Sequence, residues 1–262
     1  MAPREDKHKV RDLTVRLWRD GTGTPLVYLH GAAGVPPWLP FFTQLTGKHE
    51  VLVPEHPGFG MSDNPTWIRN VGDVAMYYLD FLDGLGAERV HVVGHSLGGW
   101  IAAELAVRNT ARLNSLTLVD AAGIHVPQVP KLDTFLLTDE QLVRGLFHDQ
   151  KRAEATIADM KRPELEDVIL KNRTTTARLT WQPRAYDPQL AKWLHRIDVP
   201  TLIVWGGNDR LFPPEYAHAW QHLIPGSRVA IIPDCGHVPQ IEQRQAFVAA
   251  LDGFLEGKRA AA

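Results

Sequence analysis

The chain has 262 residues, of which 22% are charged and 44% are hydrophobic, and its formal net charge is -2 with an isoelectric point near 6.6. This composition is that of an ordinary globular protein and excludes a disordered or fibrous chain. A nucleic-acid partner is not expected, because proteins that bind DNA or RNA usually carry a basic face that moves the net charge well above zero.

The N-terminal run and the cysteine content predict a cytoplasmic protein. The run MAPREDKHKVRD is densely charged and lacks the apolar core of a signal peptide, and no run approaches the roughly 18 apolar residues of a membrane span. Cys235 is the single cysteine, so neither an intrachain disulfide nor a thiolate metal cluster can form. No membrane span is therefore predicted, and the oligomeric state is left open.

Short apolar runs alternate with longer amphipathic stretches, which is the pattern of a mostly parallel β-sheet with crossover helices. Strands are predicted at 25–31, 50–56, 89–95, 113–121, 200–207 and 227–234, with one or two further edge strands between 8 and 19. Such continuous Val, Ile and Leu runs suit strands that are covered on both faces. Helices are predicted at 71–85, 98–109, 213–226 and 241–255.

The alternation breaks once, between about residues 124 and 190, where polar helical stretches occur without a convincing strand. The simplest account is a helical insertion between two strands of the sheet. In open α/β sheets ligands bind beyond the carboxyl ends of the strands, so an insertion there would cover the ligand site. We therefore predict a core in two parts, 1–123 and 191–262, with a helical cap at 124–190.

The stretch VVGHSLGGW, residues 92–100, follows a predicted strand and opens a predicted helix. Ser96 stands two residues after Gly94 and two before Gly98, the G-x-S-x-G arrangement of a sharp strand-to-helix turn. Glycines on both sides leave room for backbone that a β-carbon would block. The strand and helix context favours a nucleophilic serine over a plain glycine-rich turn.

A nucleophilic serine needs a general base and a carboxylate that orients the base. Asp209 lies in LIVWGGNDRLFPP, just beyond a predicted strand and at the same sheet edge as Ser96. Its alternative role is to cap the helix that follows. His237 lies in IIPDCGHVPQIE, again between a strand and a helix, and the order Ser, Asp, His is the one that this kind of turn requires.

The chain has twelve histidines, so position near a strand end is weak evidence by itself. His95 adjoins Ser96, but neighbours on such a turn point apart, and we expect it to be structural. His30 is expected to brace loops. The loop YLHGAAG, residues 28–34, could supply the oxyanion hole, with the backbone N–H of Ala32 as one donor (Ala33 is the alternative) and that of Leu97 as the other.

Together these motifs resemble the α/β-hydrolase fold family of serine hydrolases, in its small, cap-bearing esterase or C–C hydrolase form. The resemblance runs from about residue 10 to 256 and rests on five motifs in order, HGAAG, EHPGFGMSD (55–63), GHSLGG, GGNDRLFPP and CGHVPQIE. It implies an eight-stranded, largely parallel sheet, a cap inserted after the strand ending near Asp120, and Ser96, Asp209 and His237 as the triad. It does not identify the substrate.

Some members of that family place the acid at the end of the earlier strand. In that case Asp120 would orient the histidine and Asp209 would be the helix cap. Family members that act on haloalkanes or epoxides carry aspartate at the nucleophile position, whereas this chain has Ser96. Hydrolases that cleave C–C bonds commonly carry tryptophan after the histidine, whereas Val238 follows His237 here.

The sequence thus predicts a serine hydrolase that cleaves a small carboxylic ester through an acyl-enzyme, with no cofactor and no metal. The apolar cap residues that could line a pocket or pack the cap are Phe135, Leu136, Leu146, Phe147 and Trp181. C–C bond hydrolysis of a diketone acid is the alternative reaction, with Arg173, Arg178 or Arg184 binding the substrate carboxylate. A non-catalytic ligand-binding protein is the alternative of another class.

Overall fold

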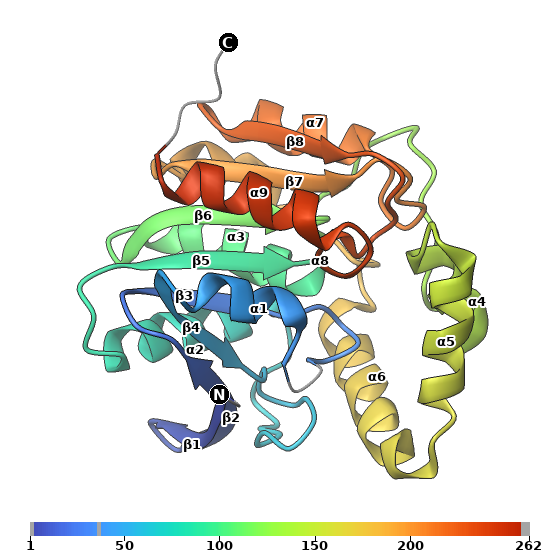
Figure 1. Cartoon of the computed structure of the whole chain (residues 1–262), viewed down its shortest axis with the longest axis horizontal. Helices are drawn as coiled ribbons and strands as arrows, with labels where there is room; N and C mark the ends of the chain where they lie inside the picture. The colour runs from blue at the N-terminus through green and yellow to red at the C-terminus, as the bar shows by residue number, and fades with distance from the viewer. Residues whose placement is uncertain (1–2, 36–37, 258–262) are drawn as a thin grey trace.

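A computed structural model describes residues 3–35 and 38–257. Eight strands form one sheet in the order β1-β2-β4-β3-β5-β6-β7-β8 (Figure 1). β1 pairs antiparallel with β2 and β2 with β4, and the remaining neighbours pair in parallel. The mostly parallel, eight-stranded sheet predicted from the sequence is therefore confirmed.

The strands occupy the predicted runs, with ends that differ by a few residues. Because successive side chains of a strand point to opposite faces of the sheet, each strand contributes side chains to both sides. Their bounds are β1 Arg4–Val10, β2 Leu13–Asp20, β3 Thr24–Leu29, β4 His49–Pro54, β5 Val90–His95, β6 Leu113–Val119, β7 Thr201–Gly206 and β8 Arg228–Ile232.

Helices cover both faces of the sheet. α1 (Pro40–Leu45) and α9 (Arg244–Leu255) lie on one face, in front in Figure 1. α2 (Val71–Gly84), α3 (Leu97–Arg108) and α7 (Glu215–Leu223) lie on the other. The sequence did not predict α1.

The helix predicted at 241–255 is two helices rather than one. α8 (Pro239–Glu242) is followed by Gln243, whose φ of -122° and ψ of 50° are not helical. α9 begins at the next residue, Arg244. The apolar spacing of this region continues across the break, so periodicity alone could not reveal it.

Two apolar cores result from this layering. Alternate residues such as Val27 and Leu29 pack toward α2, α3 and α7, whereas Leu26 and Tyr28 pack toward α1 and α9. Full burial of such a side chain contributes about 1.5–3 kcal/mol. The two-sided burial fixes the sheet and hence the positions of the loops at its carboxyl edge.

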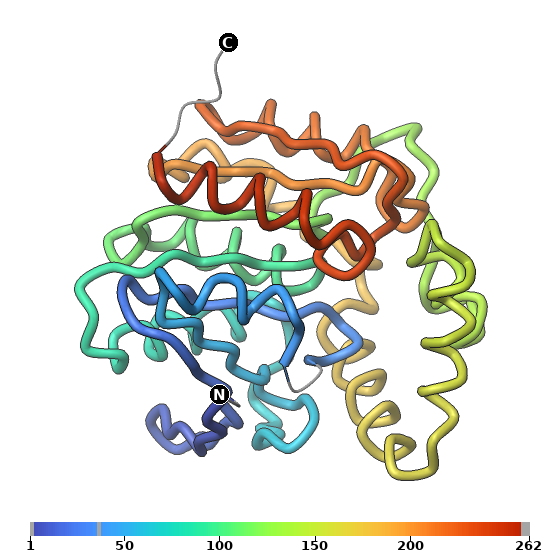
Figure 2. Tube along the Cα trace, in the orientation of Figure 1, coloured from blue at the N-terminus to red at the C-terminus, as the bar shows by residue number. Residues whose placement is uncertain are grey.

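The chain between β6 and β7 leaves the sheet. It contains α4 (Asp139–Leu146), α5 (Gln150–Met160), η1 (Pro163–Leu165), α6 (Glu166–Thr180), η2 (Leu190–Lys192) and η3 (Leu194–Arg196). This fully described stretch has no β-strand and only an isolated bridge between Gly123 and Tyr186. The trace in Figure 2 shows α4, α5 and α6 standing beside the ends of the central strands, where the arrowheads of Figure 1 point.

Candidate active site

Ser96 occupies the sharp turn between β5 and α3. Its φ of 54° and ψ of -114° lie in a region that a residue with a β-carbon rarely adopts. The turn is held on both sides, because Ser96 N–H donates to Val119 O at 2.9 Å and Ser96 O accepts from Trp100 N at 3.1 Å. The strained backbone leaves the side chain at the carboxyl edge of the sheet with 8% of the residue exposed.

Glycines are required on both sides of this turn. A β-carbon on Gly94 would lie 2.3 Å from the carbonyl oxygen of Gly98, and one on Gly98 would lie 2.0 Å from that of Leu29. Both distances are far inside van der Waals contact with backbone atoms that cannot move aside. The steric reason that the sequence suggested for G-H-S-L-G is therefore present in the structure.

Ser96, His237 and Asp209 meet at the sheet edge from three separate loops. Ser96 Oγ donates to His237 Nε2 at 2.9 Å, and His237 Nδ1 donates to Asp209 Oδ2 at 2.7 Å. His237 and Asp209 are almost completely buried. This chain of hydrogen bonds aligns a serine hydroxyl, an imidazole and a carboxylate for proton transfer.

The remaining oxygen of Asp209 is held by backbone. Asp209 Oδ1 accepts from Leu211 N at 2.7 Å and from Phe212 N at 3.1 Å. Asp209 thus holds its own loop and His237 at once. It does not cap the helix that follows, which was its alternative role, because the N-cap residue of α7 is Pro214 and no side chain caps that helix. Three hydrogen-bond donors surround this buried carboxylate.

Asp120 is the other acid that the sequence allowed. It follows β6, is fully buried, and its Oδ1 accepts from Gly206 N at 2.9 Å. His237 Nδ1 donates its hydrogen bond to Asp209 and not to Asp120. Burial, and next the charge of Asp209, raise the pKa of Asp120 well above its ordinary value.

Two other histidines near Ser96 brace loops. His95 Nε2 contacts the backbone oxygen of His237 at 2.8 Å, and burial lowers the pKa of His95 to about 3. His30 stacks on His56 with ring centroids 3.7 Å apart and accepts from His56 N through Nε2 at 3.0 Å. Burial lowers the pKa of His30 to about 4, so both side chains are neutral supports.

The glycine-bearing loop after β3 lies beside the serine. A β-carbon on Gly31 would lie 3.3 Å from Cβ of Ser96, and Gly34 N donates to Gly31 O at 3.1 Å to close a tight turn. Ala32 is at the first central position of that turn. Leu97 is the first residue of α3, where backbone N–H groups have no partner within the helix.

Sequence reasoning missed the side chains of α6 that hold this loop. Asn172, which is 4% exposed, donates from Nδ2 to Ala33 O at 3.0 Å and accepts through Oδ1 from Gly60 N at 2.9 Å. Thr176 Oγ1 donates to Ala32 O at 3.4 Å. One helix face thereby ties together the loops after β3 and β4.

The same face makes further contacts with the loop after β4. Lys171 Nζ donates to Gly60 O at 2.6 Å and to Ser62 O at 2.8 Å, and Thr175 Oγ1 donates to Gly58 O at 2.7 Å. Polar residues at one-turn spacing along a helix were the only signal in the sequence, and nothing in that signal names the loops as partners.

The loop that carries His237 is fastened to the segment around α4. His237 N donates to Leu146 O at 2.7 Å. The buried carboxylate of Glu242 accepts from Gly236 N at 2.6 Å, from Asp149 N at 2.7 Å and from His148 N at 3.2 Å. The catalytic candidate is thus positioned in part by residues from outside the sheet.

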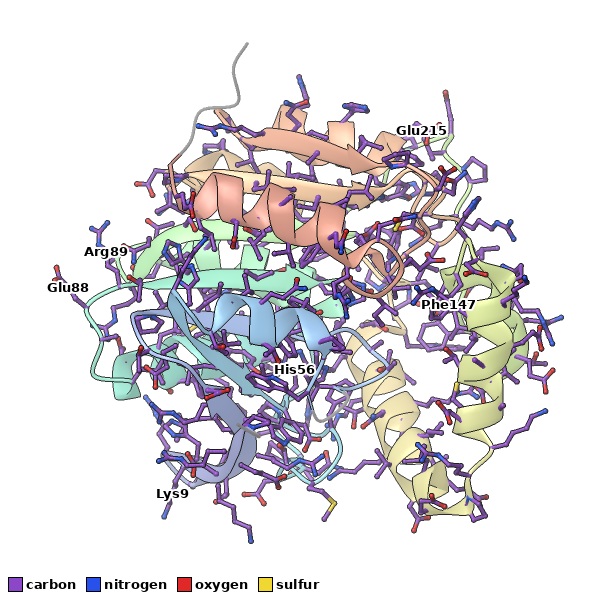
Figure 3. All side chains as sticks on the ribbon, viewed as in Figure 1. Lys9, His56, Glu88, Arg89, Phe147 and Glu215 are labelled. Carbon is purple, nitrogen blue, oxygen red and sulfur yellow. The ribbon has the colours of Figure 1, made fainter. Side chains whose placement is uncertain are left out.

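The apolar residues expected in this region divide into two groups. Phe147 packs with Val238 in a third small core and points toward the sheet in Figure 3, and Leu146 packs against the same core. Phe135 and Trp181 stack edge-on with ring centroids 5.0 Å apart, and Trp181 is half exposed. Leu136 is 75% exposed.

The three arginines proposed to bind a substrate carboxylate already have partners. Their side chains bond to acids or an amide of the protein, Arg173 to Asp139, Arg178 to Asn64 and Arg184 to Asp133.

Lys131 is a half-buried cation that forms no ion pair with a carboxylate of the described residues. Its Nζ donates to Arg184 O at 2.8 Å and lies 5.4 Å from the ring centre of Phe212, whose ring is 5.7 Å from that of His237. Tyr186 lies on another side, 5.6 Å from Nζ. Burial lowers the pKa of Lys131, with a smaller opposing effect from the charge of Asp133.

Among the described residues, one group of acids and histidines is close enough together to hold a metal ion, and it is Asp120, Asp209 and His237. Two of its atoms already hydrogen-bond to each other, since His237 Nδ1 donates to Asp209 Oδ2. A proton therefore occupies the position between those ligands, and the arrangement fits a triad better than a metal centre. No helix among the described residues has the length and apolar content needed to cross a membrane.

Residues 24–243 match the family model of the α/β hydrolase fold, so the chain belongs to the α/β-hydrolase fold family. The 2-hydroxy-6-oxo-2,4-heptadienoate hydrolase of Pseudomonas putida is 28% identical over 90% of each chain. Lipase 3 of Moraxella sp. (strain TA144) is 29% identical over 90% of this chain and 78% of its own length. The family resemblance inferred from the motifs is confirmed.

A solved structure described as a membrane phospholipase A, a novel bacterial virulence factor, superposes with a TM-score of 0.82 at 26% identity. The match covers 99% of this chain and 88% of that one. The relatives named here act on different bonds, so they support a hydrolytic function without selecting the substrate.

Proposed function

We propose that the protein is a serine hydrolase that cleaves a small carboxylic ester or related acyl compound. The observation that carries the proposal is the continuous hydrogen-bonded chain from Ser96 Oγ through His237 to Asp209, with 2.9 Å and 2.7 Å between the bonded atoms. The strained backbone of Ser96 at the sheet edge supports the same conclusion.

In this mechanism Ser96 Oγ attacks the ester carbonyl carbon while His237 Nε2 takes the hydroxyl proton. The backbone N–H groups of Ala32 and Leu97 hold the oxyanion that develops on the carbonyl oxygen. Collapse of the tetrahedral intermediate breaks the ester bond, and His237 returns the proton to the departing alcohol. Water then attacks the acyl-enzyme and loses a proton to His237. The acyl bond to Ser96 Oγ breaks, His237 returns the proton to that oxygen, and the carboxylic acid leaves.

Residues 124–190 act in this proposal as a cap over the triad, inserted between core parts 1–123 and 191–262. The contacts of α6 with the loops after β3 and β4, and of Leu146 with His237, support that role. Apolar substrate groups would pack against the side of the cap that faces the sheet. The cytoplasmic location expected from the sequence remains a prediction.

Fluorophosphonate labelling combined with ester turnover tests the proposal. Wild-type protein should be labelled at Ser96 and should hydrolyse p-nitrophenyl esters, and Ser96→Ala should lose both properties while it keeps its melting temperature. Failure of the wild type to react, under conditions in which a known serine hydrolase is labelled, would favour the non-catalytic ligand-binding alternative.

A second candidate function is hydrolysis of the C–C bond of a substrate that bears a carboxylate, as in diketone acids. Lys131 is the observation that favours it, because an ammonium group without a carboxylate partner lies close to Phe212, which contacts His237. A substrate carboxylate would give this cation a charge-assisted hydrogen bond. The absence of tryptophan after His237, where Val238 stands, is the observation against it.

Lys131→Met separates the two candidates. Two p-nitrophenyl esters of equal chain length, one with a terminal carboxylate and one without, are compared together with a diketone acid. Loss of a charge-assisted hydrogen bond should lower kcat/KM for the acidic substrates by about ten-fold more than for the neutral ester. The exposed Lys192→Met is the matched control. An equal loss for both esters would remove Lys131 from substrate recognition.

A further inference from the structure

Asp120 is a buried acid beside the triad that the proposed mechanism does not use. The residue directly follows β6 and has a φ of 43°, so its backbone, like that of Ser96, is held in the left-handed region. Its Oδ1 accepts one hydrogen bond, from Gly206 N. Its Oδ2 is fully buried and has no donor among the described residues.

The neighbour of that side chain is another carboxylate. One atom each of Asp120, Asp209 and His237 lie within 4.8 Å of one another. Two ionised carboxylates cannot hydrogen-bond, because neither carries a proton, and in a site closed to water their repulsion is poorly screened. A contact between two acids becomes a hydrogen bond when one of them is protonated.

The two acids are not equivalent. Asp209 accepts hydrogen bonds from Leu211 N, Phe212 N and His237 Nδ1, whereas Asp120 accepts one from a backbone N–H. Donors stabilise the charged form of a carboxylate, and burial without donors stabilises the neutral form. The proton of the pair therefore belongs on Asp120.

The other titratable groups around Asp120 act in the same direction. Burial raises the pKa of Tyr28 and of Cys235, so both side chains are neutral, and neither a phenol nor a thiol can carry a positive charge. The charge of Glu242 also contributes to the raised pKa of Asp120. None of the described groups that shift the pKa of Asp120 is a cation, and the Nδ1–H of His237 is directed at Asp209.

We propose that Asp120 and Asp209 share one proton, carried on Oδ2 of Asp120, so that the buried pair holds a single negative charge located on Asp209. Asp120 is then a positioning residue that donates to the Asp209 carboxylate and fixes its direction toward His237. A single charge also matters for catalysis. Two negative charges behind the imidazole would stabilise its protonated form, so that less of the imidazole would be free to accept the serine proton.

This inference rests on the proposed serine hydrolase mechanism for its kinetic test but not for its spectroscopic one. Asp120→Asn retains a neutral side chain of the same shape, with an amide donor for Asp209 and an oxygen for Gly206 N. It should lower kcat/KM for a p-nitrophenyl ester by a few-fold and leave the acidic limb of the pH profile in place. Asp120→Ala, which removes both contacts, should lower kcat/KM by about 100-fold.

If Asp120 were charged, the acidic limb of the pH profile would move in Asp120→Asn. Its removal in Asp120→Asn would take a negative charge away from the imidazole, which disfavours the protonated form, and the acidic limb would move to lower pH by about one unit or more. That movement would overturn the proposal.

Infrared spectroscopy tests the same point without turnover. At pH 8 the carbonyl stretching band of a protonated carboxyl group should be present, and Asp120→Asn should lack it. A wild-type spectrum without such a band would refute the shared proton even if the protein hydrolyses esters. A band in a protein that fails to hydrolyse esters would leave the shared proton standing and reject the hydrolase.

Discussion

The carboxyl edge of the sheet and the α4–α6 segment, residues 124–190, meet around the same serine but are built in different ways. At the edge, Ser96, Asp209 and His237 are buried and every one of them is held by hydrogen bonds. In the α4–α6 segment the helices are polar, and α5 buries only Ala153 and Ile157. The edge is thus fixed by its own buried hydrogen bonds, whereas the α4–α6 segment acts on it through a few specific contacts, such as those of Asn172 and Leu146, and is polar elsewhere.

Removal of the proposed nucleophile should have the largest effect at the edge. Ser96→Ala should lower kcat for ester hydrolysis by about 10⁴-fold or more, because no other group can form the acyl-enzyme. The melting temperature should change little, since alanine also carries a β-carbon at this φ. Steady-state turnover and fluorophosphonate labelling measure the effect, and a labelled Ser96→Ala protein would contradict the assignment.

The acid of the triad should have the next largest effect. Asp209→Asn should lower kcat by about 10³- to 10⁴-fold, because an amide donor facing Nδ1 favours the wrong histidine tautomer. Asp12→Asn, on the exposed surface, is the matched control and should leave kcat unchanged. Comparable losses in both variants would show that the assay reports stability instead of catalysis.

The junction between the two regions should show a moderate effect on stability. Asn172→Ala leaves Gly60 N and Ala33 O without their side-chain partner, which should lower the free energy of unfolding by about 1–3 kcal/mol. Urea denaturation measures the loss. The loop after β3, which carries the proposed oxyanion donor Ala32, is tied through the same side chain, so kcat should fall as well. An unchanged kcat would mean that the loop holds its shape without α6.

The smallest effect is expected on the exposed side of the α4–α6 segment. Arg173 pairs with Asp139, and both side chains are about half exposed, so Arg173→Ala should change the free energy of unfolding by less than about 1 kcal/mol. The change should shrink further at high salt. A loss of unfolding free energy as large as that of Asn172→Ala would show that ion pairs hold the α4–α6 segment more than the buried amide of Asn172 does.

Much of the core could be predicted from the sequence because its signals are local. Apolar runs bounded by glycine and proline placed the strands within a few residues, and the G-H-S-L-G spacing identified the strained turn at Ser96. Short α1 was missed because six residues give too little periodicity to recognise a helix. The break at Gln243 was missed because the apolar spacing continues on both sides of it.

Residue types and their order in the chain determined the family, the candidate triad and the layered sheet, because each depends on patterns that span only a few neighbouring positions. The tertiary structure alone decided which partner each buried polar group meets. Asp209 rather than Asp120 reaches His237, Asn172 bridges two loops, and Lys131 bonds to the backbone oxygen of Arg184 instead of to an acid. Those pairings depend on distances between segments far apart in the chain. Burial makes them matter, because a buried polar group without a partner costs free energy.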